Sequence, residues 1–119
     1  MITQKAYGSG SVTFREDTDK QTIDAIVKDW PEKEKYGIDV IVDDYGTITL
    51  EFLFLPQTWN KTGFEKVLEK LEPYTKSGRC RLTTKDYAWI YQYYPDNINR
   101  WLCYCEKALS TWVLDEAID

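Results

Sequence analysis

The chain has 119 residues, of which 43% are hydrophobic and 29% charged, and its formal net charge is −5. These proportions predict a single globular domain over residues 1–119 and exclude an intrinsically disordered chain. The longest apolar run covers residues 52–56, far less than the roughly 20 residues of a membrane-spanning helix, and no signal peptide precedes it, so we expect a cytoplasmic protein without a membrane partner.

The N-terminal part of the chain predicts a strand followed by a helix. Residues 11–15 alternate between apolar and polar side chains, as a half-buried strand does, and the glycine-rich residues 8–10 should precede this strand. Thr18, with Gln21 three positions later, is a capping box, which marks the start of a helix. The helix should end before Pro31, because proline cannot continue it.

The middle of the chain predicts two further strands and a second helix. The strands cover residues 38–42 and 47–55, with Gly46 in the turn between them, and Pro56 should end the second strand. Residues 60–72 then carry apolar side chains at helical spacing, so one face of this helix should pack on the sheet.

The C-terminal part of the chain is rich in aromatic residues. A strand over residues 79–84 precedes two strands, 87–94 and 100–105, in which large rings occupy alternate positions. Residues 95–97 are proline, aspartate and asparagine, which favour a turn, so the two strands should form a hairpin. The pattern of residues 108–118 suits a short helix or a strand extension.

This order of elements predicts an α+β fold. The β-α-β-β-α-β order is that of the ferredoxin-like arrangement, in which both helices cover one face of an antiparallel sheet, with the aromatic hairpin as a C-terminal addition. A continuous meander with both helices on one side is the alternative. The sheet residues expected beneath the helices are Val12, Phe14, Val40, Val42, Leu50 and Phe52.

The sequence contains no recognisable catalytic, metal or cofactor motif. It has no histidine, which excludes a Ser–His or Cys–His nucleophile pair. Its three cysteines are an odd number, which argues against a disulfide framework, and a zinc site would lack a fourth ligand. We therefore expect a protein that is not an enzyme and that has neither a metal nor a cofactor.

An RNA-recognition domain shares the predicted order of strands but needs stacking aromatic rings on the exposed face of its sheet. The residues expected on this face include no ring, which excludes RNA recognition there. They are Ser11, Thr13, Arg15, Thr47, Thr49 and Glu51.

All of the excess negative charge lies in the first half of the sequence. Residues 1–57 carry eleven acidic and six basic side chains, whereas residues 58–119 carry nine of each. An acidic surface commonly serves solubility alone, but it can also imitate the phosphates of a nucleic acid and attract a basic protein. The candidate carboxylates are Asp24, Asp29, Glu32, Glu34, Asp39, Asp43 and Asp44.

The aromatic hairpin is a second candidate surface, because cationic residues alternate with rings along it. Such a mixture suits a protein interface or the binding of nucleic acid bases and phosphates, although the same rings can also serve as core. The candidate residues are Arg79, Arg81, Trp89, Tyr91, Tyr93, Arg100 and Trp101.

These features favour a small acidic protein-binding module that inhibits or regulates a basic, nucleic-acid-binding protein partner. In size, acidity and lack of catalytic residues the chain is similar to phage anti-CRISPR and anti-restriction proteins, although it carries no motif of a particular family. The carboxylates would steer the partner and the rings would supply buried contact. The alternatives are a nucleic-acid or nucleotide binder that uses the hairpin, and a self-associating structural protein such as a homodimer.

Overall fold

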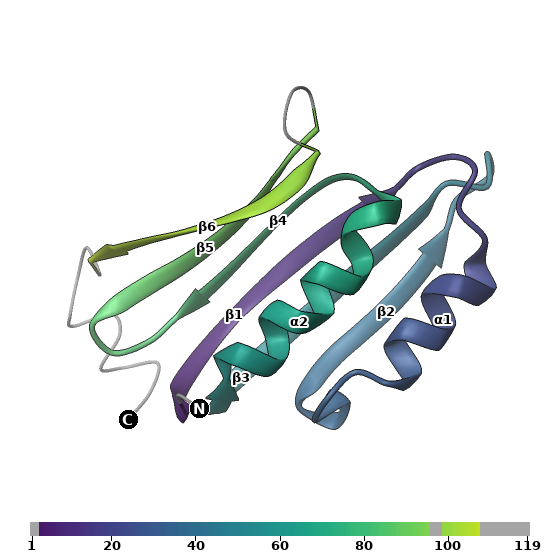
Figure 1. The fold of residues 1–119 in the computed structure, drawn as a ribbon. Coiled ribbons are helices and arrows are strands. Elements are labelled where there is room, and N and C mark those ends of the chain that lie inside the picture. The colour runs from purple at the N-terminus through teal and green to yellow at the C-terminus, as the bar shows by residue number, and fades with distance from the viewer. Residues whose placement is uncertain (1–2, 96–98, 108–119) are drawn as a thin grey trace.

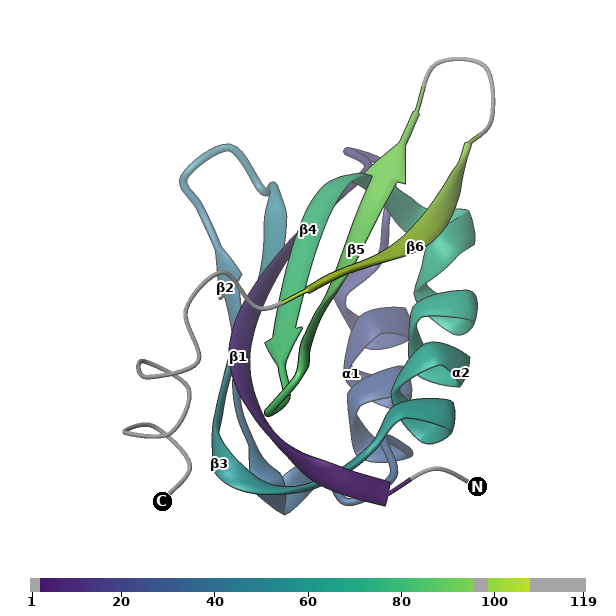
Figure 2. The same cartoon turned by 90° about the vertical axis from the view of Figure 1, so that its left-hand side faces the viewer.

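The computed structural model describes residues 3–95 and 99–107. Within these residues, six antiparallel strands form one sheet and two helices lie on one of its faces (Figures 1 and 2). Short 3-10 turns at Lys33–Lys35 and Glu72–Tyr74 follow the helices. The elements are β1 (Thr3–Phe14), α1 (Lys20–Lys28), β2 (Tyr36–Val42), β3 (Ile48–Asn60), α2 (Lys61–Leu71), β4 (Thr75–Thr83), β5 (Tyr87–Tyr94) and β6 (Arg100–Lys107).

The strands lie in the order β2-β3-β1-β4-β5-β6. The predicted α+β class and antiparallel sheet are confirmed, and a continuous meander is excluded because β1 lies between β3 and β4. The order differs from that of a simple four-stranded ferredoxin-like sheet, because β5 and β6 extend the sheet beyond β4. Residues 96 and 97 of the predicted turn, and residues 108–118, which suited either a helix or a strand extension, lie outside the described residues.

The first strand is much longer than predicted, because residues 8–10 lie inside β1 and do not precede it. The register of β1 against β3 shifts between Ala6 and Gly8. At Gly8 the chain comes so close to β4 that a Cβ atom would lie 1.9 Å from the carbonyl oxygen of Arg81. Glycine is therefore required here by the close approach of two backbones.

The third strand continues past Pro56 to Asn60, so the prediction that Pro56 ends it is wrong. The pairing of β2 with β3 stops at Phe54, which leaves one side of β3 without a described partner strand beyond that point. On its other side, Pro56 lies opposite the register shift of β1. Proline is tolerated at such edges and bulges because no ladder hydrogen bond needs its missing N–H.

Both helices begin at a side-chain cap. The cap of α1 is Asp19 and not the predicted Thr18, since the Asp19 carboxylate accepts a hydrogen bond from the Gln21 backbone N–H at 3.0 Å. The cap of α2 is Asn60, whose side-chain oxygen accepts from the Gly63 N–H at 3.0 Å. Each cap satisfies one of the backbone donors that a helix start leaves unpaired. Neither helix is long and apolar enough to cross a membrane.

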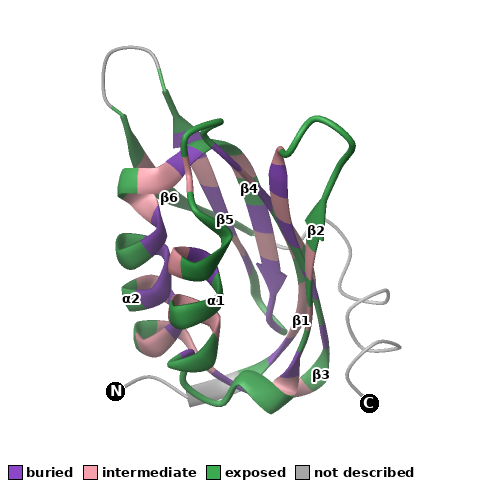
Figure 3. Ribbon diagram, turned by 90° about the vertical axis from the view of Figure 1, so that its right-hand side faces the viewer, coloured by how far each residue is buried: buried purple, intermediate pink, exposed green. Residues whose placement is uncertain are grey.

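The core lies between the helices and the sheet, where Figure 3 shows the buried segments facing each other. The ring of Phe64 is at its centre, with five aromatic rings at centroid distances of 5.1 to 6.3 Å. Of the six residues expected beneath the helices, four are buried and Val40 is half-buried. Val42 is 46% exposed, because it ends β2 beside the exposed turn.

Candidate functional site

The acidic residues singled out in the sequence lie along one side of the molecule. This side is formed by α1, the connection that follows it, β2 and the β2–β3 turn, and we call it the acidic edge (Figure 1). Residues 19–47, which make up the acidic edge, carry eight acidic and four basic side chains, a net −4 of the chain's −5. All seven candidate carboxylates are exposed there: Asp24, Asp29, Glu32, Glu34, Asp39, Asp43 and Asp44.

Two of the seven carboxylates are neutralised locally. Asp24 pairs with Lys20 at 2.8 Å, and Glu32 pairs with Lys35 at 3.0 Å. Exposed ion pairs of this kind are weak, and each stabilises the folded state by about 0–1 kcal/mol. The other five form no ion pair with a described residue. Asp43 accepts hydrogen bonds from the backbone of the turn, and the charges of the remaining four are free to act on a partner: Asp29, Glu34, Asp39 and Asp44.

Large apolar side chains are exposed beside these carboxylates. Tyr45 is 95% exposed at the tip of the β2–β3 turn, and Ile41 and Val42 are each 46% exposed on β2. The Asp43 carboxylate accepts hydrogen bonds from the N–H groups of Tyr45 and Thr47, both at 2.9 Å, which holds the turn in shape. Exposed rings and aliphatic groups with charges around them are typical of protein-binding surfaces.

The second candidate surface is divided between the two faces of the sheet. Cys80, in the core, pairs across the strands with Tyr91, whereas Arg79 and Arg81 pair with Gln92 and Ile90. Because side chains alternate between faces, Trp89, Tyr91 and Tyr93 face the helices and the two arginines face the other side. The prediction of one aromatic and basic cluster is therefore wrong.

Most of the predicted aromatic anchors serve the chain's own core. Tyr91 and Tyr93 are 2% and 3% exposed, so they offer no contact area to a partner. Trp89 and Trp101 are half-buried and pack against the core. The reason is that β5 lies inside the sheet, between β4 and β6, with its rings covered from the side of α2.

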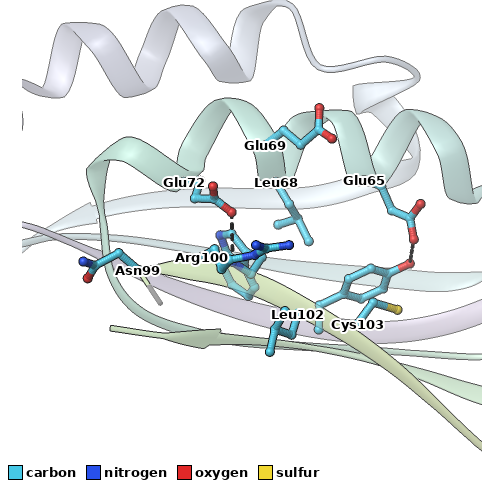
Figure 4. Close-up of a pocket in the computed structure, with 10 residues that line it drawn as sticks. Glu65, Leu68, Glu69, Glu72, Asn99, Arg100, Leu102 and Cys103 are labelled. Carbon is cyan, nitrogen blue, oxygen red and sulfur yellow. Dashed lines mark hydrogen bonds between the residues drawn. The ribbon is translucent and has the colours of Figure 1, made fainter. Parts of the chain in front are cut away.

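A groove of about 430 Å³ separates α2 from β6 (Figure 4). The indole ring of Trp101 lines the groove. The ring can lie there because Gly78 has no side chain, since a Cβ at Gly78 would be 2.5 Å from the ring. The residues that line the groove are Glu65, Leu68, Glu69, Glu72, Tyr91, Asn99, Arg100, Trp101, Leu102 and Cys103.

Polar contacts hold the α2 wall of this groove against β5. The Tyr91 hydroxyl donates to the Glu65 carboxylate at 2.8 Å, and Lys61 donates to the same oxygen at 2.7 Å (Figure 4 shows the Tyr91 contact). The Lys61 ammonium also lies 4.4 Å from the centre of the Trp89 ring, a cation–π distance. These contacts tie α2, one wall of the groove, to β5.

Comparison with protein-family models, with curated proteins and with solved structures finds no match to this chain. Within residues 3–95 and 99–107, no three His, Cys, Asp or Glu side chains are grouped so that they could hold a metal ion. The two surfaces that can indicate a function are therefore the acidic edge and the groove.

The groove was not predicted from the sequence. The one signal for it is that Glu65, Glu69 and Glu72 are spaced so that they share one face of a helix.

Burial suppresses the ionisation of several groups in the core. Burial raises the pKa of Tyr36 to about 12 and the pKa of the Cys80 thiol to about 12. Burial also raises the pKa of Tyr91, and its neighbours Cys103 and Glu65 raise it further. In each case the protein interior disfavours the anion.

We expect the free energy of unfolding to fall as the pH rises above about 9. In the unfolded chain, thiols ionise near pH 8.5 and tyrosine hydroxyls near pH 10. The folded chain keeps the protons of Cys80 and Tyr36 to about pH 12, so the unfolded state binds fewer protons and the slope is negative. Each group contributes at most about 1.4 kcal/mol per pH unit.

Urea unfolding between pH 7 and pH 11 measures this decline. The Cys80→Ala variant should lose the part of the decline that begins near pH 8.5, whereas Cys105→Ala, at an exposed thiol, should keep it. A free energy of unfolding that stays constant up to pH 11 would contradict the expectation.

Proposed function

We propose that this chain is a protein-binding module, without enzymatic activity, whose acidic edge engages a basic, nucleic-acid-binding partner in the cytoplasm. One observation carries the proposal. The stretch with a net charge of −4, residues 19–47, also presents the exposed side chains of Ile41, Val42 and Tyr45. Charge supplies attraction over a distance, and the apolar groups supply contact area once the partner has arrived.

The proposed mechanism is competition for the nucleic-acid-binding surface of the partner. Lysine and arginine side chains that bind phosphates would meet the carboxylates of Asp29, Asp39 and Asp44 instead. Asp29 at the end of α1, Asp39 on β2 and Asp44 in the β2–β3 turn are already exposed, so the surface needs no rearrangement before it binds. The chain would then act as an inhibitor or regulator, and antagonism of the anti-CRISPR or anti-restriction type is its most concrete form.

We also infer that β1 to β4 and the two helices form a ferredoxin-like unit, with β5 and β6 added as a C-terminal hairpin. The order β2-β3-β1-β4 and the antiparallel pairing of every neighbour support this inference. In such a unit β2 is an edge strand, which is where the proposed function needs it.

Affinity capture tests the proposed function. The immobilised chain is incubated with nuclease-treated lysate of its native host, and the bound protein is challenged with duplex DNA. We expect release by DNA, and about tenfold weaker capture by the Asp39→Asn/Asp44→Asn variant, which keeps side-chain shape but loses two charges.

The matched control is Glu16→Gln/Asp86→Asn, which removes two exposed charges outside the acidic edge and should capture normally. Equal capture by both double variants would contradict the proposal, and so would a bound protein that DNA does not displace.

A second candidate function, nucleic-acid or nucleotide binding, is favoured by one observation on the face of the sheet opposite α1 and α2. Arg79 and Arg81 lie there beside Ser9 and Ser11, and together with Glu51 they line a shallow cavity of about 430 Å³. Arg81 is held by Glu106 at 3.1 Å, which leaves Arg79 as the cation without an ion pair among the described residues. Titration with a labelled single-stranded oligonucleotide at low salt separates the two functions. Only the second function predicts that the chain binds the oligonucleotide and that Arg79→Ala weakens this binding.

A further inference from the structure

The outer side of β6 faces α2 and has no strand beside it among the described residues. β6 is the last strand in the order, and the Trp101 N–H donates to the Glu72 carboxylate at 2.9 Å instead of to β5. In an antiparallel pair, successive N–H groups point alternately toward the partner strand and away from it. The N–H groups of Cys103 and Cys105, two and four positions further on, therefore also point away from β5.

The opposite wall of the groove is one face of α2. Glu65, Leu68, Glu69 and Glu72 are spaced at three, four and seven positions, so they share one side of α2. Leu68 and Glu72 point toward β6, whereas the exposed Glu69 carboxylate points away from it (Figure 4). The volume of about 430 Å³ is within the roughly 300–1,000 Å³ of ligand-binding clefts. The groove thus combines a strand edge without a described partner strand, the apolar side chains of Leu68 and Trp101, and the acidic side chains of α2.

We propose that this groove binds an extended peptide as an additional strand of the sheet, with lysine or arginine side chains of the peptide facing the carboxylates of α2. The backbone of the peptide pairs with Cys103 and Cys105, which is the strand-addition mode of peptide recognition. The proposal goes beyond the acidic edge, since β2 and β6 are opposite ends of the sheet.

The spacing of the charges selects the kind of peptide. Alternate residues of a strand lie about 6.8 Å apart on one face, and Glu65 and Glu69 are separated by about 6 Å along the helix axis. A peptide with basic residues at every second position therefore matches the acidic wall. Glu69 forms no ion pair with a described residue, whereas Glu65 already holds Lys61. Arg100, at the end of the groove, is the one cation among its lining residues.

Two other occupants fit the groove less well by charge. Residues 108–119 of this chain carry three acidic and no basic side chains, so the acidic wall would repel them. A second copy of β6 would bring Arg100, Glu106 and Lys107, with no basic residues at alternate positions. A basic peptide is therefore the occupant that the charges favour.

Calorimetric titration with an acetylated and amidated heptapeptide of alternating lysine and valine, at 150 mM salt, tests the proposal. We expect saturable binding, with no binding of the matching glutamate–valine peptide. Cys103→Pro removes the outward N–H and should weaken binding about tenfold, whereas Cys103→Ala keeps the N–H and should change it less than about twofold. Proline is tolerated on the outer side of an edge strand.

Two further variants complete the test. Glu69→Lys, at an exposed position of α2, should weaken binding about tenfold by charge reversal, while Asp39→Asn/Asp44→Asn should leave binding unchanged and so separates the groove from the acidic edge. If Cys103→Pro fails to fold, Glu69→Lys decides alone.

Several results would overturn the proposal. These are no binding of the lysine–valine peptide at 1 mM, equal binding of the glutamate–valine peptide, and unchanged affinity in Glu69→Lys. A wild-type chain that sediments as a dimer, and as a monomer when Cys103 is replaced by proline, would assign the strand edge to a second copy and would equally overturn it.

Discussion

Replacing Phe64 with alanine is expected to lower the free energy of unfolding by about 3–5 kcal/mol, the range found for large aromatic residues in protein cores. Phe64 is 1% exposed, and its ring lies near rings of β2, β3, β5 and the segment after α1. The closest, Tyr91, lies at a centroid distance of 5.1 Å. The substitution removes all of these contacts at once and leaves a cavity that stiff aromatic neighbours cannot fill.

Urea unfolding of Phe64→Ala, with Lys66→Ala as the control, measures this effect. Lys66 lies on the same helix two positions away but is exposed, so its substitution should change the stability by less than about 0.5 kcal/mol. A loss below about 1.5 kcal/mol in Phe64→Ala would mean that the aromatic cluster does not organise the core as described.

Replacing Gly8 with alanine is expected to cost roughly 3 kcal/mol, at the upper end of the penalties for overpacking. The new Cβ atom would lie 1.9 Å from the Arg81 carbonyl oxygen and 3.0 Å from the Leu82 Cα. Both are backbone atoms, so no side chain can rotate out of the way. Relief requires β1 and β4 to separate where the two strands pair.

The matched substitution is Gly37→Ala on β2. There the Cβ would lie 3.4 Å from the Leu53 carbonyl oxygen, an ordinary contact, and the strand position favours a residue with a side chain. Thermal unfolding should show a large fall in melting temperature for Gly8→Ala and little change or a small rise for Gly37→Ala. Equal melting temperatures would contradict the backbone approach.

Periodicity predicted the secondary structure best where one face of an element is buried. The apolar stripe expected on the second helix is fully buried in α2, from Phe64 to Leu71, because a spacing of three and four residues specifies one face without further information. The errors lie where tertiary contacts decide. Pro56 lies within β3 because neither neighbouring strand needs a hydrogen bond from this position. The pairing with β2 has ended, and the register of β1 shifts opposite Pro56.

The sequence could not show which face of β5 would be covered. Alternation in a strand identifies the residues that share a face, but not the face on which the helices lie. Ala88 and Ile90 are as buried as Tyr91, so hydrophobicity alone did not distinguish the two sides. The groove was unpredictable for the same reason, because Glu72 and Trp101 meet only after α2 and β6 have been placed by the fold. The carboxylates of the acidic edge could be grouped from the sequence, since all seven lie within residues 24–44.

The rate at which the captured partner associates with this chain tests the role of the acidic edge most directly. Between about 50 and 500 mM salt, the association rate of the wild-type chain should fall tenfold or more, as for electrostatically steered pairs. The Asp39→Asn/Asp44→Asn variant should start lower and fall less steeply. An association rate that is independent of salt, and equal in the two proteins, would contradict the proposal that negative charge on this side of the molecule brings the partner in.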